Sequence, residues 1–232
     1  MPYAEEEDTR KVQTAVIGRA ASDRPVFLPY DHDDFDRFMR GRTRDDFYCG
    51  ILLGGCGKRL SPKRYTDKKC HFAHRPPVHC RRTEVGEDSA DHLYIGRAVA
   101  DWLGQQGQRA VHVVYKPEGH QVREVVDVSY EAGRRLIRVQ LARRSKREWE
   151  GANAELRVRH PELDWLFGPD SLLANWQVER QGYALRVQCR SLGTTRAVEI
   201  GTQFPDRPVE WTSLSECTLT PEGIVTPNLL HT

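Results

Sequence analysis

Long apolar runs are missing from this chain of 232 residues. No stretch approaches the roughly 18 apolar residues that a membrane-spanning helix needs. The start is acidic, with Glu5, Glu6 and Glu7 in a row, and lacks the basic and then apolar pattern of a secretory signal. Walker loops, dinucleotide-binding glycine motifs and the signatures of a serine or cysteine nucleophile are absent as well. These absences favour a cytoplasmic protein without a membrane partner.

Composition excludes little beyond this. The sequence is 38% hydrophobic and 29% charged, which is ordinary for a globular protein, and its net charge of +2 is unevenly distributed. Its length allows one large domain or two small ones with a real core. No internal repeat or low-complexity tract is visible.

Cysteine is scarce, but its distribution is informative. Of the six cysteines, four lie between residues 49 and 80, where they are interleaved with His71 and His74. Thiolate and imidazole are the ligands of structural zinc, and a closed site with four ligands can substitute for a core in a short segment. Disulfides would need an oxidising compartment, and nothing in the sequence indicates one. The segment therefore predicts a structural zinc site, whereas the isolated Cys189 and Cys217 are expected to be buried small residues.

The ligand set can be narrowed by chain geometry. Glycines at positions 54, 55 and 57 allow the backbone to turn tightly between Cys49 and Cys56, so these two cysteines form one arm. Cys70 and His71 are adjacent and, if extended, point to opposite faces, so only one of them is expected to bind. The predicted ligands are Cys49, Cys56, His74 and Cys80, with Cys70 as the first substitute.

Hydrophobic periodicity predicts an α+β protein in which a mixed sheet is flanked by helices. Two short strands are expected within residues 11–29 and a short helix at 31–40, ahead of the zinc segment. A helix capped by Ser89 is then followed by three strands, a helix and a strand, at about 110–115, 122–130, 136–141, 146–158 and 163–167. The last part predicts a helix capped by Asp170 or Ser171 and a small antiparallel sheet, at 183–190, 196–203 and 209–214. The corresponding segments are 1–46, 47–88, 89–168 and 169–232.

The cysteine pair and the His71-Phe-Ala-His74 word, followed by Ser89-Ala-Asp-His92 and then by strands carrying Asp127 and Gln140, resemble the CoiA-like competence nuclease family. The resemblance covers about residues 49–167. It implies a zinc-ribbon-like part before a restriction-endonuclease-like core that uses Mg²⁺ or Mn²⁺ to process DNA. It also implies that Asp91, Asp127 and Gln140 are the catalytic residues.

One departure from the family pattern bears on activity. The position of the family's metal-binding Glu on the third strand is occupied by Arg138. A guanidinium about 4 Å from a cation costs on the order of a few kcal/mol at an effective dielectric constant of 20. We expect Asp127 to pair with Arg138 across neighbouring strands, giving a site that binds phosphate without cutting it. Solvent exposure is the commoner fate of an aspartate on a strand, but the valines that flank Asp127 argue for burial.

A run of basic residues points to a nucleic-acid partner. Seven of the residues from 134 to 147 are Arg or Lys and none is acidic, and the run ends where a strand leads into a helix. The predicted contacts are Arg134, Arg135, Arg138, Arg143, Arg144, Lys146 and Arg147, and Arg75, Arg81 and Arg82 can extend the surface. A solvated face is the ordinary alternative.

The sequence is compatible with three functions. The first is a zinc-containing DNA-binding protein whose nuclease-like core has lost its activity. The second is an active Mg²⁺- or Mn²⁺-dependent endonuclease in which Glu124 or Glu148 replaces the missing acid, although Glu124 has the wrong strand parity relative to Asp127. The third is a module that docks onto a protein partner through the zinc segment and the C-terminal strands. The sequence does not define the oligomeric state.

Overall fold

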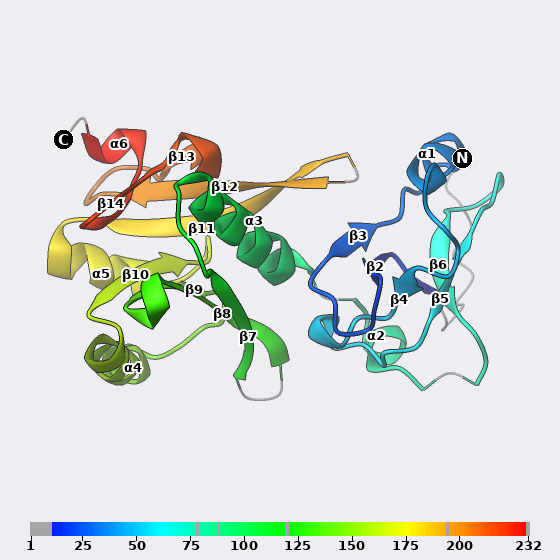
Figure 1. Cartoon of the computed structure of the whole chain (residues 1–232), viewed down its shortest axis with the longest axis horizontal. Helices are drawn as coiled ribbons and strands as arrows, with labels where there is room; N and C mark the ends of the chain where they lie inside the picture. Colours follow the sequence, from blue (N-terminus) through cyan, green and yellow to red (C-terminus); the bar gives the residue numbers. More distant parts are fainter. Residues whose placement is uncertain (1–10, 78, 88, 119–120, 194, 231–232) are drawn as a thin grey trace. The chain divides into compact units, whose positions relative to one another are not determined.

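A computed structural model describes residues 11–77, 79–87, 89–118, 121–193 and 195–230, with side chains left undescribed at 117–118 and 121–124. The chain divides into two compact units, residues 1–93 with 191–196, and residues 94–190 with 197–232 (Figure 1). Within the described residues, no helix combines the length and the apolar character needed to cross a bilayer.

The first unit is built on two three-stranded sheets, ordered β1-β6-β5 and β3-β2-β4, with antiparallel neighbours throughout. The elements are β1 (Lys11–Val12), β2 (Thr14–Ile17), β3 (Pro25–Phe27), α1 (His32–Met39), β4 (Phe47–Tyr48), the 3₁₀ turn η1 (Ile51–Leu53), β5 (Leu60–Lys63), β6 (His71–His74) and α2 (Arg81–Glu84). The core of this unit includes Val12 and Phe35 as well as Phe47 and Phe72, so the segments 1–46 and 47–88 share one core.

The predicted helix after the first strands is confirmed, and its acidic start has a structural role. Asp31 is the N-cap of α1 and accepts hydrogen bonds from the backbone N–H groups of Asp33 and Asp34. These bonds hold the pKa of the Asp31 carboxyl below its ordinary value. Phe35 and Phe38 are buried on the other side of the helix. The acidic cluster is therefore the N-terminal turn of a helix, and its first member, Asp31, caps that helix.

The second unit contains a seven-stranded mixed sheet in the order β13-β12-β11-β10-β9-β8-β7. Strands β7, β8 and β9 are antiparallel neighbours, whereas β9, β10 and β11 run parallel, because α4 and α5 cross over between them. The elements are α3 (Asp91–Gln105), β7 (His112–Glu118), β8 (Gln121–Tyr130), η2 (Glu131–Gly133), β9 (Arg135–Gln140), α4 (Lys146–Arg159), β10 (Glu162–Phe167), α5 (Leu173–Gln181), β11 (Ala184–Leu192), β12 (Thr195–Gln203), β13 (Glu210–Ser213), η3 (Leu214–Glu216), β14 (Thr218–Thr220), β15 (Gly223–Val225) and α6 (Pro227–Leu230).

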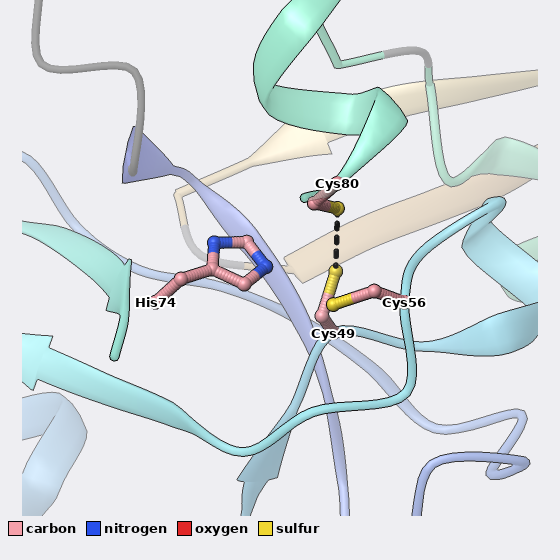
Figure 2. A group of neighbouring side chains, drawn as sticks. All are labelled: Cys49, Cys56, His74 and Cys80. Carbon is pink, nitrogen blue, oxygen red and sulfur yellow. Dashed lines mark hydrogen bonds between the residues drawn. The ribbon is translucent and has the colours of Figure 1, made fainter. Parts of the chain in front are cut away.

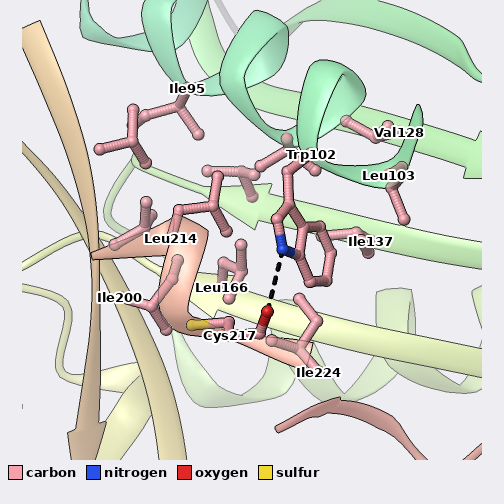
Figure 3. Packing of buried hydrophobic residues seen from close by; sticks show 14 of the residues in the cluster. Ile95, Trp102, Leu103, Val128, Ile137, Leu166, Ile200, Leu214, Cys217 and Ile224 are labelled. Atoms are coloured by element: carbon pink, nitrogen blue, oxygen red, sulfur yellow. Dashed lines mark hydrogen bonds between the residues drawn. The ribbon is translucent and has the colours of Figure 1, made fainter. Parts of the chain in front are cut away.

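Alternation along the strands gives this sheet two apolar faces. On one face, Val128, Ile137 and Leu166 meet Trp102 of α3, whose indole N–H donates to the carbonyl of Cys217 at 3.1 Å (Figure 3). The other face packs against α4 and α5 in a second cluster; its large members are Trp149, Leu156, Trp165 and Phe167. The predicted order of helix, three strands, helix and strand is thus confirmed, within a sheet covered on both sides.

The C-terminal part differs from its prediction. Strands β11, β12 and β13 continue the large sheet and do not form a separate antiparallel one; only β14 and β15 pair apart from it. The reason is that Ala184–Val187 of β11 are buried on both faces, so alternation in the sequence did not reveal how the strand pairs. The predicted cap of α5 is also wrong, because Leu172 occupies the N-cap position and no side chain caps the helix.

Candidate metal centre and nucleic-acid interface

Three cysteines and one histidine meet inside the first unit. The donor atoms of Cys49, Cys56, His74 and Cys80 all lie within 4.8 Å of one another (Figure 2). The Sγ atoms of Cys49 and Cys80 are 3.6 Å apart. Cys49, His74 and Cys80 are buried, and Cys56 is partly exposed. Among the described residues this is the group that can hold a metal ion, and it consists of the four residues that the sequence favoured.

The loop between the first two cysteines explains how they converge. The Gly55 N–H donates to the carbonyl of Gly50, and the Gly57 N–H donates to the carbonyl of Cys49, at 2.9 and 2.8 Å. A Cβ atom on Gly55 would lie 2.5 Å from the Cys49 sulfur, closer than any real contact. Gly57 adopts φ +75°, a left-handed conformation that favours glycine. The glycines therefore let the backbone wrap around the Cys49 thiol.

His74 and Cys80 reach the group from secondary structure. His74 ends β6 and shares the inner face of its sheet with Phe72, because alternate residues of a strand point the same way. Cys80 is the N-cap residue of α2. The alternative ligand Cys70 is not in the group, since its sulfur contacts the backbone N–H and carbonyl of Tyr65. His71 occupies the opposite face of β6, so of the adjacent pair neither residue joins the group.

A buried arginine lies beside the thiols. Arg82 is 2% exposed, donates to the Cys49 sulfur at 3.7 Å and forms an ion pair with Glu87. Glu87 in turn accepts hydrogen bonds from the backbone N–H groups of Gln13 and Thr14. The expectation that Arg82 extends a basic surface is therefore corrected, because its charge faces the metal-binding group. Sequence reasoning missed this role, because nothing in the local pattern distinguishes Arg82 from the exposed Arg81.

Burial opposes ionisation of the thiols when no metal binds them. Burial raises the pKa of the Cys49 thiol, and it raises the pKa of Cys56 to about 11. Burial also opposes ionisation of Cys80, but the backbone N–H of Arg82 and the Cys49 thiol hold the pKa of Cys80 below its ordinary value. Because a metal binds thiolate, binding must release protons, and affinity must fall as the pH is lowered.

In the second unit, Asp127 and Arg138 face each other across β8 and β9. They are register partners, both 6% exposed, and the Arg138 Nε lies 3.6 Å from the Asp127 Oδ1. On the other side, the Lys116 Nζ of β7 lies 2.6 Å from the Asp127 Oδ2. Asp127 is thus held between two cations, one buried and one 42% exposed. The sequence anticipated Arg138 as the partner but did not anticipate Lys116.

The remaining predicted catalytic residues have structural contacts of their own. Gln140 is fully buried at the end of β9, and its side-chain amide donates to the carbonyl of Ala142 at 3.2 Å. Asp91 belongs to the first unit, where it forms an ion pair with Arg196 at 2.6 Å. The neighbouring His92 is buried and bonded to the carbonyl of Leu52, and burial lowers its pKa. The side chain of Glu124 lies outside the described ones, and Glu148 belongs to the capping box of α4.

The basic run divides into two groups with different environments. Arg135, like Arg138, is buried, and it is bonded to Glu162 and to the carbonyls of Thr220 and Pro221. Arg134 is exposed but is paired with Glu162. Burial removes Arg135 and Arg138 from any surface that a nucleic acid can touch. The four cations that follow β9 are Arg143, Arg144, Lys146 and Arg147; Arg144 is partly buried and the other three are exposed.

Comparisons with models of known protein families, with curated proteins and with solved structures gave no match.

Proposed function

We propose that this chain is a zinc-containing, DNA-binding protein with a nuclease-like core that does not cleave DNA. The observation that carries the proposal is the placement of Asp127 between Lys116 and Arg138, next to a strand that leads into four basic residues.

Zinc is the metal favoured by the donor set. Three thiolates and one imidazole are soft and borderline ligands, which suit Zn²⁺ and disfavour Mg²⁺ or Ca²⁺. In a tetrahedral site with Zn–S bonds of about 2.3 Å, two sulfurs lie about 3.8 Å apart. The separation of 3.6 Å between the Cys49 and Cys80 sulfurs fits this geometry. All four positions are filled by protein, which is typical of a structural site, and the net negative charge of such a site would be offset by Arg82.

The nuclease-like reading of the core rests on its element order and on three strand positions. Helix α3 and strands β7 to β9 follow one another in the order that the resemblance to the CoiA-like family implies, and α4 and β10 continue the core. Asp127 on the second strand, with Arg138 and Gln140 on the third, occupies the corresponding motif positions. The match at the Glu position fails, because Arg138 stands there.

The charges around Asp127 argue against metal-dependent cleavage. Two-metal and one-metal phosphodiesterases need carboxylates that converge on a cation. Here the ion-pair partners of the Asp127 carboxylate are an ammonium and a guanidinium. A divalent cation would have to displace at least one of them. The site therefore disfavours Mg²⁺.

The exposed cations at the β9–α4 junction supply the contact surface. Lys146 and Arg147 begin α4 and Arg143 lies just before its N-cap Ser145, so all three are close to the helix N-terminus, which carries a partial positive charge. The Lys146 ammonium sits 5.8 Å above the ring of Trp176. This junction lies at the carboxyl end of β9, the edge at which ligands commonly bind in sheets with parallel strands. Phosphate contacts of this kind bind DNA with little dependence on sequence.

Binding and cleavage can be tested together. A fluorescein-labelled duplex titrated with the zinc-loaded protein should give affinity that falls steeply with KCl concentration. Replacing Arg143 and Lys146 by Gln should reduce the slope of log affinity against log salt by about 1.8, or about 0.9 per lost phosphate contact. The matched control, Arg109→Gln with Arg180→Gln, removes two exposed cations elsewhere in the same unit. Binding that is absent, or insensitive to salt, would overturn the proposal.

Cleavage is the outcome that would favour the active nuclease. Plasmid incubated with the protein and Mn²⁺ should stay intact, and Asp127→Ala should behave identically. Nicking that requires Asp127 would show that the enzyme is active despite Arg138. The converse variant is Arg138→Glu, which places a second carboxylate opposite Asp127. Adding Mn²⁺ should raise the thermal midpoint of Arg138→Glu and should leave that of the wild type unchanged.

A further inference from the structure

The outer face of the small sheet β1-β6-β5 in the first unit has no assigned role so far. In this sheet Ser61 lies opposite Ala73, and Lys63 lies opposite His71, while β1 places Lys11 beside Ala73. Residues directly opposite each other share a face, so these five form the outer face. Its central residues Ala73 and His71 are buried, whereas Lys63 is exposed at its edge. The inner face carries Val12, Phe72 and Leu60, which are buried in the core, together with the ligand His74.

The outer face is basic and partly aromatic. Lys63 and Arg75 are exposed, and the Arg75 Nε donates to the Ser61 hydroxyl at 3.4 Å, which holds the guanidinium over the sheet. Tyr65 stacks on His71 with ring centroids 5.2 Å apart, and the Lys68 ammonium lies 4.6 Å above the Tyr65 ring. None of the outward residues of the three strands is acidic. The connection between β5 and β6 contains a single acid, Asp67.

We infer that this face is a second DNA-contacting surface, which binds the phosphate backbone of a duplex through Lys11, Lys63, Lys68 and Arg75. The inference rests on the proposed function and extends it to the other unit. Charge complementarity selects a polyanion, and because Tyr65 is already stacked on His71 and covered by Lys68, its ring is not open for a base to stack on. Contacts to phosphates, which need only cations and donors, are what remains.

The metal-binding group gives this face its rigidity. His74 anchors the end of the central strand β6 from the inner side, one residue before Arg75. The connection from β5 to β6 is fixed at its far end by Cys70, whose backbone N–H donates to the carbonyl of Tyr30. A cation fixed over a sheet loses less side-chain entropy on binding than one on a mobile loop. The structure thus links the metal centre to a contact surface that faces the opposite way.

Salt-dependent binding of the zinc-loaded full chain to a fluorescein-labelled 20-base-pair duplex tests the inference. The double variant Lys63→Gln with Arg75→Gln should reduce the slope of log affinity against log salt by about 1.8. The conservative pair Lys63→Arg with Arg75→Lys should keep the wild-type slope. A matched control, Arg24→Gln with Arg44→Gln, removes two exposed cations of the same unit that lie outside this sheet, and it should leave the slope unchanged. Zinc content and the thermal midpoint establish that each variant is folded.

The outcomes separate this inference from the proposed function. If only the variants at Arg143 and Lys146 lower the slope, the junction binds DNA and the sheet face does not, which overturns the inference alone. If only the sheet-face pair lowers it, the inference stands and the junction is not the contact surface. Equal slopes for the sheet-face pair and its matched control overturn the inference, and a wild type that binds no duplex overturns both.

Discussion

Asp127 has two ion-pair partners, and distance and burial predict opposite orders for how much each partner stabilises the fold. Lys116 is the closer partner, at 2.6 Å, whereas Arg138 is 3.6 Å away. At 3.6 Å and an effective dielectric constant of 20, two unit charges attract by about 4–5 kcal/mol. The Lys116 side chain is 42% exposed, so solvent screens its pair, and surface pairs contribute about 1 kcal/mol or less. We therefore expect the more distant, buried guanidinium to matter more.

Three variants measure how much Asp127 and each of its two partners contribute to the free energy of unfolding. Asp127→Asn leaves the buried guanidinium without its counter-charge and should lower the free energy of unfolding by about 3–5 kcal/mol. Arg138→Gln leaves Asp127 paired with Lys116 alone and should cost about 2–3 kcal/mol, while Lys116→Gln should cost about 1 kcal/mol or less.

Urea unfolding at neutral pH, followed by tryptophan fluorescence, is the appropriate assay. All five tryptophans belong to the second unit, so the signal reports on that unit without interference from the metal centre. A loss for Lys116→Gln that equals the loss for Arg138→Gln would refute the reasoning, because it would mean that distance outweighs burial at this site.

Three further predictions address the metal group, the glycines and one carboxyl. Elemental analysis should find about one zinc per chain; Cys49→Ser should lose it, whereas Cys70→Ser, which removes a thiol outside the group, should retain it. Gly104 lies in α3 with nothing near its Cβ position, so Gly104→Ala should stabilise the protein to thermal unfolding by up to about 1 kcal/mol. Gly55→Ala should instead weaken zinc retention, because the added methyl group would meet the Cys49 sulfur. Burial raises the pKa of Asp164 to about 6, and this carboxyl lines a cavity of about 280 Å³ beside Arg135. The raised pKa favours the protonated folded state, so its contribution is complete below pH 4 and is lost as the pH rises through 6. Asp164→Asn should remove this loss and gain about 1–3 kcal/mol at pH 7 relative to the wild type; an unchanged pH profile of urea stability would contradict the assignment.

Much of the candidate metal site could be predicted from the sequence. The glycines between Cys49 and Cys56 are a local property of the chain, and they already bring these two ligands together. The choice between Cys70 and Cys80 was not local. It depends on where the chain after β6 returns, and the structure returns Cys80, at the start of α2, to within 3.6 Å of the Cys49 sulfur.

The basic run shows the opposite case. The sequence counts Arg134 to Arg147 as one charged stretch, but the sheet buries Arg135 and Arg138 beside Glu162 and Asp127. Three cations after β9 stay exposed, namely Arg143, Lys146 and Arg147. Charge is a property of a residue, whereas exposure depends on strands that are far away in the chain. For the same reason, Arg82 could not be distinguished from an ordinary surface arginine.

By itself, the sequence determined the periodic elements of the core, the α+β class and the pairing of Cys49 with Cys56 in the metal-binding group. These follow from spacing, backbone freedom and side-chain chemistry, all of which act over a few residues. Only the tertiary structure decided that the C-terminal strands extend one seven-stranded sheet, that Lys116 reaches Asp127, and which cations remain at the surface. Strand pairing and burial are settled by contacts between distant segments, whose free energies local patterns do not encode.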